Sequence, residues 1–176
     1  MSSGAERTTE SFFSIAPQNM RQYQRMTGPR TLPPVDSVDR RILATIQNDG
    51  RISLTELAAA IPLGLSATRI RLQKLQESGV IEGYSAHVDP AALGYPLRAL
   101  VRLSVHGRQD DRVFAIVEAE PRIVRCLRVT GEICFVFEIV AADMAELEGI
   151  TLQLAKLGDL ATDMVYEVVS DRAVPV

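Results

Sequence analysis

Polar, basic and small side chains alternate with aliphatic ones in residues 65–78, at a spacing that suits one helix with two unlike faces. If Thr68, Leu72 and Leu75 form a buried stripe, a rotation of about 100° per residue places hydroxyl, amide and basic groups on the opposite side. Such groups match the hydrogen-bonding edges of bases and the charge of phosphates. The outward residues are Ser66, Ala67, Arg69, Ile70, Arg71, Gln73 and Lys74.

The chemistry of these side chains divides them into two expected roles in nucleic-acid binding. Small or neutral side chains are expected near base edges, namely Ser66, Ala67, Ile70 and Gln73. Basic side chains are expected on phosphates or guanine, namely Arg69, Arg71 and Lys74. Arg51, which precedes another predicted helix, is placed to meet phosphate, with a surface ion pair as the alternative. For the whole set, the alternative is a charged helix face that contacts only solvent.

Few residues could instead support catalysis or hold a metal. The two histidines, His87 and His106, fall at no spacing typical of metal ligands, and the sequence has neither a phosphate-binding glycine-rich loop nor a nucleophile elbow. Cys126 and Cys134 are too few for a disulfide framework and are expected to be small buried side chains. We therefore predict no enzyme activity, no catalytic residue, no metal and no cofactor.

Charge is distributed unevenly along the 176-residue chain, whose net charge is −3. Residues 1–34 carry four Arg and two Glu, and residues 35–81 carry six basic and five acidic side chains. Residues 82–176 carry nine basic and fifteen acidic side chains, a net −6 that phosphate would repel. Any contact with nucleic acid is therefore expected on the front part of the chain.

The hydropathy of the chain suggests neither a membrane span nor a secretory signal. No apolar run approaches the ~20 residues that cross a bilayer, and the N-terminal segment lacks the apolar core of a signal peptide. We expect a cytoplasmic protein without a membrane partner. Residues 1–34 show no sustained periodicity and end in two prolines, so we predict a flexible N-terminal extension there.

Residues 35–81 show the pattern of three short helices. Asn48-Asp49-Gly50 separates the first two, and a turn at residues 62–64 precedes the third, which ends before Gly79. Three short helices with a tight turn between the last two are typical of a helix-turn-helix. We predict a DNA-binding domain at residues 35–81, of the winged or plain helix-turn-helix type, with its motif at about residues 54–74.

Capping residues mark the starts of these helices. Asp36 or Ser37 is available to the first helix, and Ser53 with Glu56 fits a capping box for the second. The third helix follows Gly64, which lacks a side-chain oxygen, so that Ser66 could cap one half-turn later instead.

Behind the third helix the hydrophobic period changes from 3.6 to 2. After a linker at residues 82–96, the predicted elements are strands at Leu97–Val105, Ile123–Val129, Ile133–Val140 and Ala161–Val169, with helices at about Asp110–Ala119 and Ala142–Leu157. This βαββαβ order predicts an α+β, ferredoxin-like domain at residues 97–172.

Helices cover only one face of a sheet with this topology. Within the predicted strands, apolar residues occur at both odd and even positions in Leu100–Val105 and Ile133–Val140. The open face of the sheet is therefore expected to carry apolar side chains as well. We therefore predict that the rear domain forms a homodimer or a higher oligomer, such as a tetramer or octamer.

Several short runs of residues follow one another in a specific order across both predicted domains. They are Asp39-Arg40-Arg41-Ile42-Leu43, Asn48-Asp49-Gly50-Arg51-Ile52-Ser53, Glu56-Leu57-Ala58, Arg71-Leu72-Gln73-Lys74-Leu75, Gly79-Val80-Ile81-Glu82-Gly83-Tyr84 and, before a strand of the rear domain, Val129-Thr130-Gly131. In this order and spacing they resemble the leucine-responsive/asparagine (Lrp/AsnC) family of transcription regulators. The resemblance covers about residues 35–172.

This resemblance implies a sequence-specific DNA-binding transcription regulator, modulated through its C-terminal domain by a small-molecule effector, an amino acid or a related metabolite. It implies that one turn lines the effector pocket, with the residues Thr130, Gly131, Glu132 and Cys134. The family commonly places an aspartate where Cys134 stands, and a thiol does not offer the charge that suits an α-amino group. The class of effector therefore stays open.

The partner implied by this architecture is double-stranded DNA. Each front domain has a net charge of only +1, so binding depends on several tethered domains and a pseudo-palindromic operator with half-sites ~10 bp apart or a multiple of that. One alternative is an oligomeric small-molecule-binding module with weak or vestigial DNA binding. An RNA-binding protein is disfavoured, because the predicted sheet lacks a pair of exposed aromatic residues for base stacking.

Overall fold

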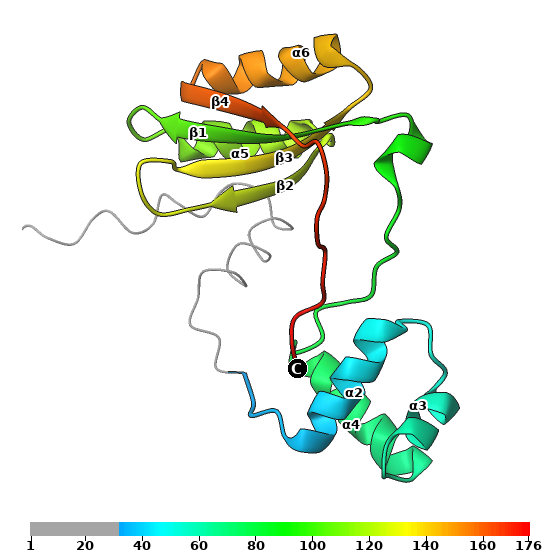
Figure 1. Ribbon diagram of the computed structural model, residues 1–176. Helices are drawn as coiled ribbons and strands as arrows, with labels where there is room; N and C mark the ends of the chain where they lie inside the picture. The colour runs from blue at the N-terminus through cyan, green and yellow to red at the C-terminus, as the bar shows by residue number, and fades with distance from the viewer. Residues whose placement is uncertain (1–31) are drawn as a thin grey trace, which may run out of the picture. The chain divides into compact units, whose positions relative to one another are not determined.

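The computed structural model describes residues 32–176, and the chain divides after Tyr84 into two compact units (Figure 1). Each unit has a hydrophobic core of its own. The prediction of a flexible N-terminal extension falls mainly on residues 1–31, which lie outside the described residues. No helix in the described part of the chain is long and apolar enough to cross a membrane.

The first unit consists of three α-helices: α2 (Ser37–Asn48), α3 (Leu54–Ala60) and α4 (Leu65–Glu77). The side chains that close its core come from all three helices and the turn between the last two, and they are Ile42, Leu57, Ile61 and Leu75. Residues 32–84 contain no strand. The predicted helix-turn-helix is confirmed, with α3 and α4 joined by residues 61–64.

Side-chain caps begin the first two helices, as the sequence predicts. Asp36 caps α2 and Ser53 caps α3, and each takes part in a reciprocal capping box, with Asp39 and Glu56 respectively. Hydrogen bonds to Ser53 lower the pKa of the Glu56 carboxyl below its ordinary value. The suggested cap at Ser66 is wrong, because α4 begins at Leu65 with Gly64 as its N-cap and no side-chain cap.

The second unit has the predicted βαββαβ order. Its elements are β1 (Leu97–Val105), α5 (Asp110–Ala119), β2 (Ile123–Arg128), β3 (Phe135–Ala141), α6 (Met144–Ala155) and β4 (Gly158–Met164). The four strands form one antiparallel sheet in the order β2-β3-β1-β4. The two helices lie against the same face of this sheet (Figure 1). A 3-10 helix, η1 (Pro90–Leu93), begins at an Asp89 cap and precedes β1.

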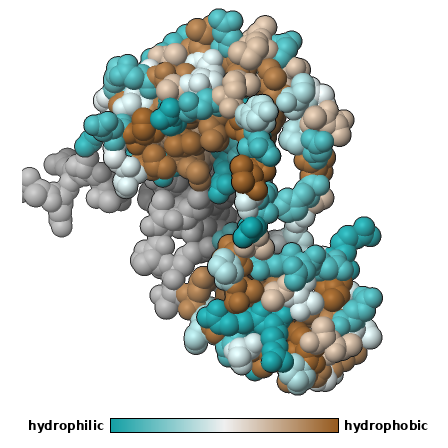
Figure 2. Space-filling model, in the orientation of Figure 1, coloured by the Kyte–Doolittle hydropathy of each residue, from teal (hydrophilic) through white to brown (hydrophobic). Residues whose placement is uncertain are grey.

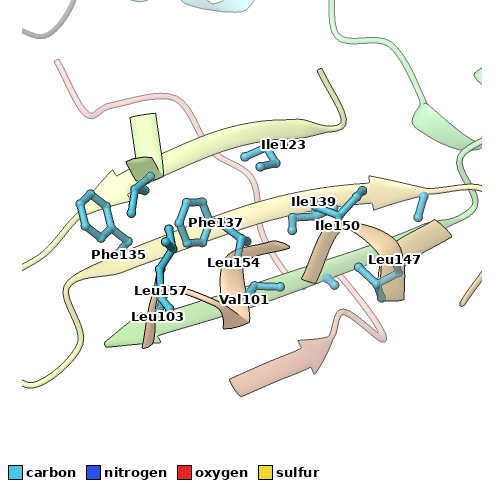
Figure 3. Close-up of a cluster of buried hydrophobic side chains, with 13 residues drawn as sticks. Val101, Leu103, Ile123, Phe135, Phe137, Ile139, Leu147, Ile150, Leu154 and Leu157 are labelled. Carbon is cyan, nitrogen blue, oxygen red and sulfur yellow. The ribbon is translucent and has the colours of Figure 1, made fainter. Parts of the chain in front are cut away.

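The core of the second unit lies between the sheet and its helices. Ala99, Val101 and Leu103 of β1 face this core and are fully buried, because alternate residues of a strand point to the same side. Figure 3 shows the aromatic pair Phe135 and Phe137 of β3 within the same cluster. Their rings stack with centroids 6.1 Å apart.

The final strand differs from its prediction. β4 runs from Gly158 to Met164, three residues earlier at its start and five earlier at its end than the predicted strand at residues 161–169. The apolar residues Val165, Tyr166, Val168 and Val169 suggested a longer strand. Val165 still donates a backbone hydrogen bond to Arg98, but Tyr166 is almost fully exposed. Pairing with β1, not local hydropathy, therefore sets the limits of this strand.

Candidate nucleic-acid interface and ligand-sensing turn

Helix α4 has the two unlike faces that its sequence predicts. Thr68 and Leu75 are buried and Leu72 is half-buried, whereas Ile70 is 66% exposed. The hydroxyl of buried Thr68 donates to the Gly64 carbonyl oxygen at 3.2 Å, which satisfies this polar group inside the core. The other predicted contact residues that are exposed on α4 are Ser66, Ala67, Arg69, Gln73 and Lys74.

Two of the predicted contact residues have local hydrogen bonds that bear on their roles. The Gln73 amide nitrogen donates to the Glu77 carboxylate at 2.7 Å, one helical turn along α4. The Arg51 backbone N–H donates to the Asp49 carboxylate at 2.9 Å, in the turn between α2 and α3. Arg51 is exposed there. The assignment of Gln73 to bases and of Arg51 to phosphate stays a prediction.

Arg71 differs from its neighbours on α4, because two carboxylates of α2 bind its guanidinium. The Nη1 atom lies 2.6 Å from an Asp36 carboxylate oxygen and 2.8 Å from an Asp39 carboxylate oxygen. These hydrogen bonds raise the pKa of Arg71, while a backbone hydrogen bond from Asp39 and the side-chain bond from Arg71 lower the pKa of Asp36. The sequence suggested phosphate or guanine as the partner of Arg71, and it gave no indication of these contacts across 32 and 35 positions.

A groove in the first unit runs beside this ion pair. It has a volume of about 340 Å³. Pro33, Pro34 and Val35 line one part of it, before α2 begins, and Ile70 and Lys74 of α4 line another. Exposed Ile70 and Lys74 therefore border a recess on the surface of the helix-turn-helix unit, next to the carboxylates that bind Arg71.

The predicted sensing turn joins β2 to β3. Gly131 has a φ of +113°, a region that side-chain-bearing residues rarely adopt, so a glycine suits the bend. The ends of the turn are held by a hydrogen bond from the Val129 N–H to the Cys134 carbonyl at 3.0 Å. The Ser104 hydroxyl of β1 donates to the Glu132 carbonyl at 2.6 Å. The turn is thus fixed to its sheet, with Thr130, Gly131 and Glu132 exposed.

The two cysteines lie near this turn and form no disulfide. Both are half-buried and pack against the core of the second unit. Burial raises the pKa of the Cys126 thiol to about 11, so it stays protonated at neutral pH. Within residues 32–176, no group of three or more His, Cys, Asp or Glu residues could hold a metal ion. The predicted strand at residues 133–140 begins two residues too early, because β3 starts at Phe135 and Cys134 lies at the end of the turn.

The two units match two models of known protein families. Residues 35–82 match a winged helix-turn-helix DNA-binding model, and residues 98–175 match the Lrp/AsnC ligand-binding domain. LrpA of Mycobacterium tuberculosis, an HTH-type transcriptional regulator, is 31% identical over 129 residues, 73% of this chain and 86% of that protein. The chain belongs to the Lrp/AsnC family of transcription regulators.

Other relatives and solved structures are also similar to this Lrp/AsnC regulator. The HTH-type transcriptional regulator FL11 of Pyrococcus horikoshii is 34% identical over 114 residues, 65% of this chain and 76% of that protein. The structure of the feast or famine regulatory protein Rv3291c from M. tuberculosis, complexed with L-methionine, superposes with a TM-score of 0.74 and 28% identity, covering 81% of this chain and all of that one. Bacillus subtilis LrpC, at 24% identity and a TM-score of 0.75, shares the fold.

Proposed function

We propose that this Lrp/AsnC regulator reads its operator with the exposed face of α4 in the major groove. The observation that carries the proposal is the contrast between Thr68, which is fully buried, and Ile70, which is 66% exposed with basic neighbours on both sides. A helix of this kind fits the major groove, where apolar side chains contact thymine methyl groups. Ser66, Ala67, Ile70 and Gln73 are assigned to bases, and Arg69, Lys74 and Arg51 to phosphates.

A second copy of the chain is the proposed partner of the open sheet face. This face carries Leu100, which is 41% exposed, and hydrophobic surface is visible over β2 and β3 in Figure 2. Cross-strand ion pairs, such as Arg102 with Asp163 at 2.9 Å, place positive and negative side chains on the same face. A surface with apolar groups and both charges can complement itself across a two-fold axis.

Oligomers of this kind compensate for the weak charge of each DNA-binding unit. Linking two sites raises avidity by ~10²–10⁴-fold without any new contact. The proposed operator is therefore a pseudo-palindrome of double-stranded DNA, with half-sites ~10 bp apart or a multiple of that. Leu100→Asp is expected to dissociate the oligomer in sedimentation experiments, whereas Leu152→Asp on exposed α6 serves as the matched control. An unchanged oligomer for Leu100→Asp contradicts the proposed interface.

The proposed effector is an amino acid or a related metabolite that binds at the turn of Thr130, Gly131, Glu132 and Cys134. The complex of Rv3291c with L-methionine supports this class of ligand. Cys134 supplies no negative charge for an α-amino group. Binding would shift the equilibrium between oligomers that space the DNA-binding units differently. Light scattering and operator titrations across a panel of amino acids test this, and identical oligomer size and affinity with every compound contradict it.

The DNA-reading assignment is tested on an operator obtained by mapping the genomic sites that the protein occupies. Ile70→Ala is expected to weaken binding to this operator several-fold, with little change for scrambled DNA, because the side chain contacts bases. Leu152→Ala, an exposed apolar residue of α6, is the control and should leave both affinities unchanged. Equal operator affinity of Ile70→Ala and the parent protein contradicts the assignment. Wild-type binding that does not depend on operator sequence favours the alternative, a ligand-binding module with vestigial DNA binding.

A further inference from the structure

Arg71 lies on the border between the buried and exposed faces of α4. Its side chain is 35% exposed, and the Asp39 side chain that contacts it is only 15% exposed. The preceding residue, Ile70, is on the outer face of α4. Arg71 is therefore placed where α4 meets the first turn of α2, beside the residues assigned to DNA and not among them.

Each of the two carboxylates that bind Arg71 divides its oxygens between two tasks. Asp36 uses Oδ1 to accept the N–H groups of Val38 and Asp39, at 2.9 and 2.8 Å, and uses Oδ2 for Arg71. Asp39 uses Oδ2 for the Asp36 N–H, at 3.3 Å, and Oδ1 for Arg71. The capping box of α2 therefore orients both acceptors toward α4.

The charge of this cluster disfavours a DNA phosphate as the partner of Arg71. One guanidinium and two carboxylates give a net charge of −1, so an approaching phosphate meets more negative than positive charge. The Nη1 donor is also already engaged by both acids. Charge-assisted hydrogen bonds of this kind are shorter and stronger than neutral ones and fix the geometry of their partners.

We propose that Arg71 is a positioning residue, which clamps the recognition helix α4 to the capped N-terminus of α2 and does not itself contact DNA. The clamp fixes how α4 presents its outer face, with Ile70 and Lys74, to the major groove. Loss of the clamp is then a loss of discrimination between sequences, because small displacements misalign base contacts while phosphate attraction persists. This inference rests on the proposed role of α4 in reading DNA.

The experiment compares the full-length parent, Arg71→Ala, the double variant Asp36→Asn/Asp39→Asn and the triple variant that combines them. Asn caps helices as well as Asp, and its amide oxygen can accept the same backbone hydrogen bonds, so the double variant removes the charge of the clamp but keeps the cap. Affinities for operator and scrambled DNA are titrated at several salt concentrations. Circular dichroism melts locate the temperature at which all variants are folded.

The clamp predicts that the ratio of operator to scrambled affinity falls several-fold in both Arg71→Ala and the double variant, and falls no further in the triple variant. It also predicts an unchanged salt slope for Arg71→Ala. The electrostatic gain from removing two acids raises both affinities in the double variant and cancels in the ratio. If the Arg71→Ala variant does not fold, the ratio of operator to scrambled affinity in the double variant still tests the clamp.

Two outcomes overturn the clamp. One is an unchanged ratio in the double variant. The other is an equal loss of both affinities in Arg71→Ala, with a salt slope smaller by ~0.9 per DNA-binding unit, which is the result for a phosphate contact. Failure of the proposed DNA-reading role is distinguishable, because Ile70→Ala would then also leave the ratio unchanged.

Discussion

Gly158 lies against the backbone of Ser104 at the start of β4. A Cβ atom added at residue 158 would lie 1.9 Å from the Ser104 carbonyl oxygen. Gly158 pairs with Val105 across the β1–β4 ladder, three residues after α6 ends at Ala155. The close approach of these two strands therefore depends on the absence of a side chain at this position.

Substituting Gly158 by alanine is expected to destabilise the second unit strongly. The obstructing atom belongs to the backbone, so either β1 or β4 must shift, and overpacking of this kind costs at least ~1–3 kcal/mol. Gly149→Ala is the matched control, because no atom lies within 4 Å of its added Cβ and α6 gains ~1 kcal/mol from the better helix former. Urea unfolding measures both, and equal stability of the two variants would exclude this role of Gly158.

The N-cap of α4 is a site where stability can be gained. Gly64 has a φ of −71°, which other residues also adopt, and its added Cβ would meet open space. Gly64→Ser is expected to stabilise the first unit by a few tenths of a kcal/mol, about the difference between these residues as caps. Ser53→Ala at α3 is expected to cost ~1 kcal/mol, because it removes a cap that is already formed. Thermal unfolding measures whether each variant is more or less stable than the parent, and a loss of stability in Gly64→Ser contradicts the prediction.

The carboxylate of Glu120 gives the second unit an acid-sensitive contribution to stability. It accepts two hydrogen bonds from the Arg122 guanidinium, at 2.6 and 2.7 Å, and one from the Arg122 backbone N–H, at 3.2 Å, and these hold its pKa below the ordinary value of 4.5. Its stabilisation is therefore complete above pH 4.5 and falls as pH drops toward the lower pKa of the folded state.

Glu120→Gln should lower stability at neutral pH and flatten the fall in stability below pH 4.5. Exposed Glu148→Gln is the control and should leave the pH dependence of the parent unchanged. Denaturant unfolding across pH 3–7 measures the effect. An acid dependence as steep in Glu120→Gln as in the parent rules out this contribution.

Lys74 and Arg71 are expected to differ in how their loss affects salt dependence. Lys74 is exposed on α4 and is assigned to a phosphate, so Lys74→Ala should weaken binding to operator and scrambled DNA alike. The slope of log affinity against log salt concentration should fall in magnitude by ~0.9 per DNA-binding unit. Lys156→Ala in the acidic second unit is the control. A full salt slope in Lys74→Ala would remove this lysine from the phosphate contacts.

Local patterns predicted most of the secondary structure. The bounds of β1 and α5 agree with their predictions, because a hydrophobic period of 2 and an acidic first turn are local features. The caps at Asp36 and Ser53 were also predictable, since each requires residues only three positions apart. The buried and exposed faces of α4 followed from helical periodicity alone.

Features that depend on distant partners were predicted poorly. The early start of β4 depends on Gly158 meeting Ser104, a contact that no local pattern records. The roles assigned to Arg51, to the outer residues of α4 and to the turn at Gly131 stay predictions, because they depend on partners outside this chain.

The sequence by itself determined the order of the elements, the helix caps and the division of α4 into two faces, because each depends on residues one or two turns apart. Only the tertiary structure decided the partner of Arg71. From sequence, an arginine on an outer helix face suggests phosphate, whereas the fold brings Asp36 and Asp39 within 2.8 Å of it. Ion pairs between helices form across sequence separations that periodicity does not encode.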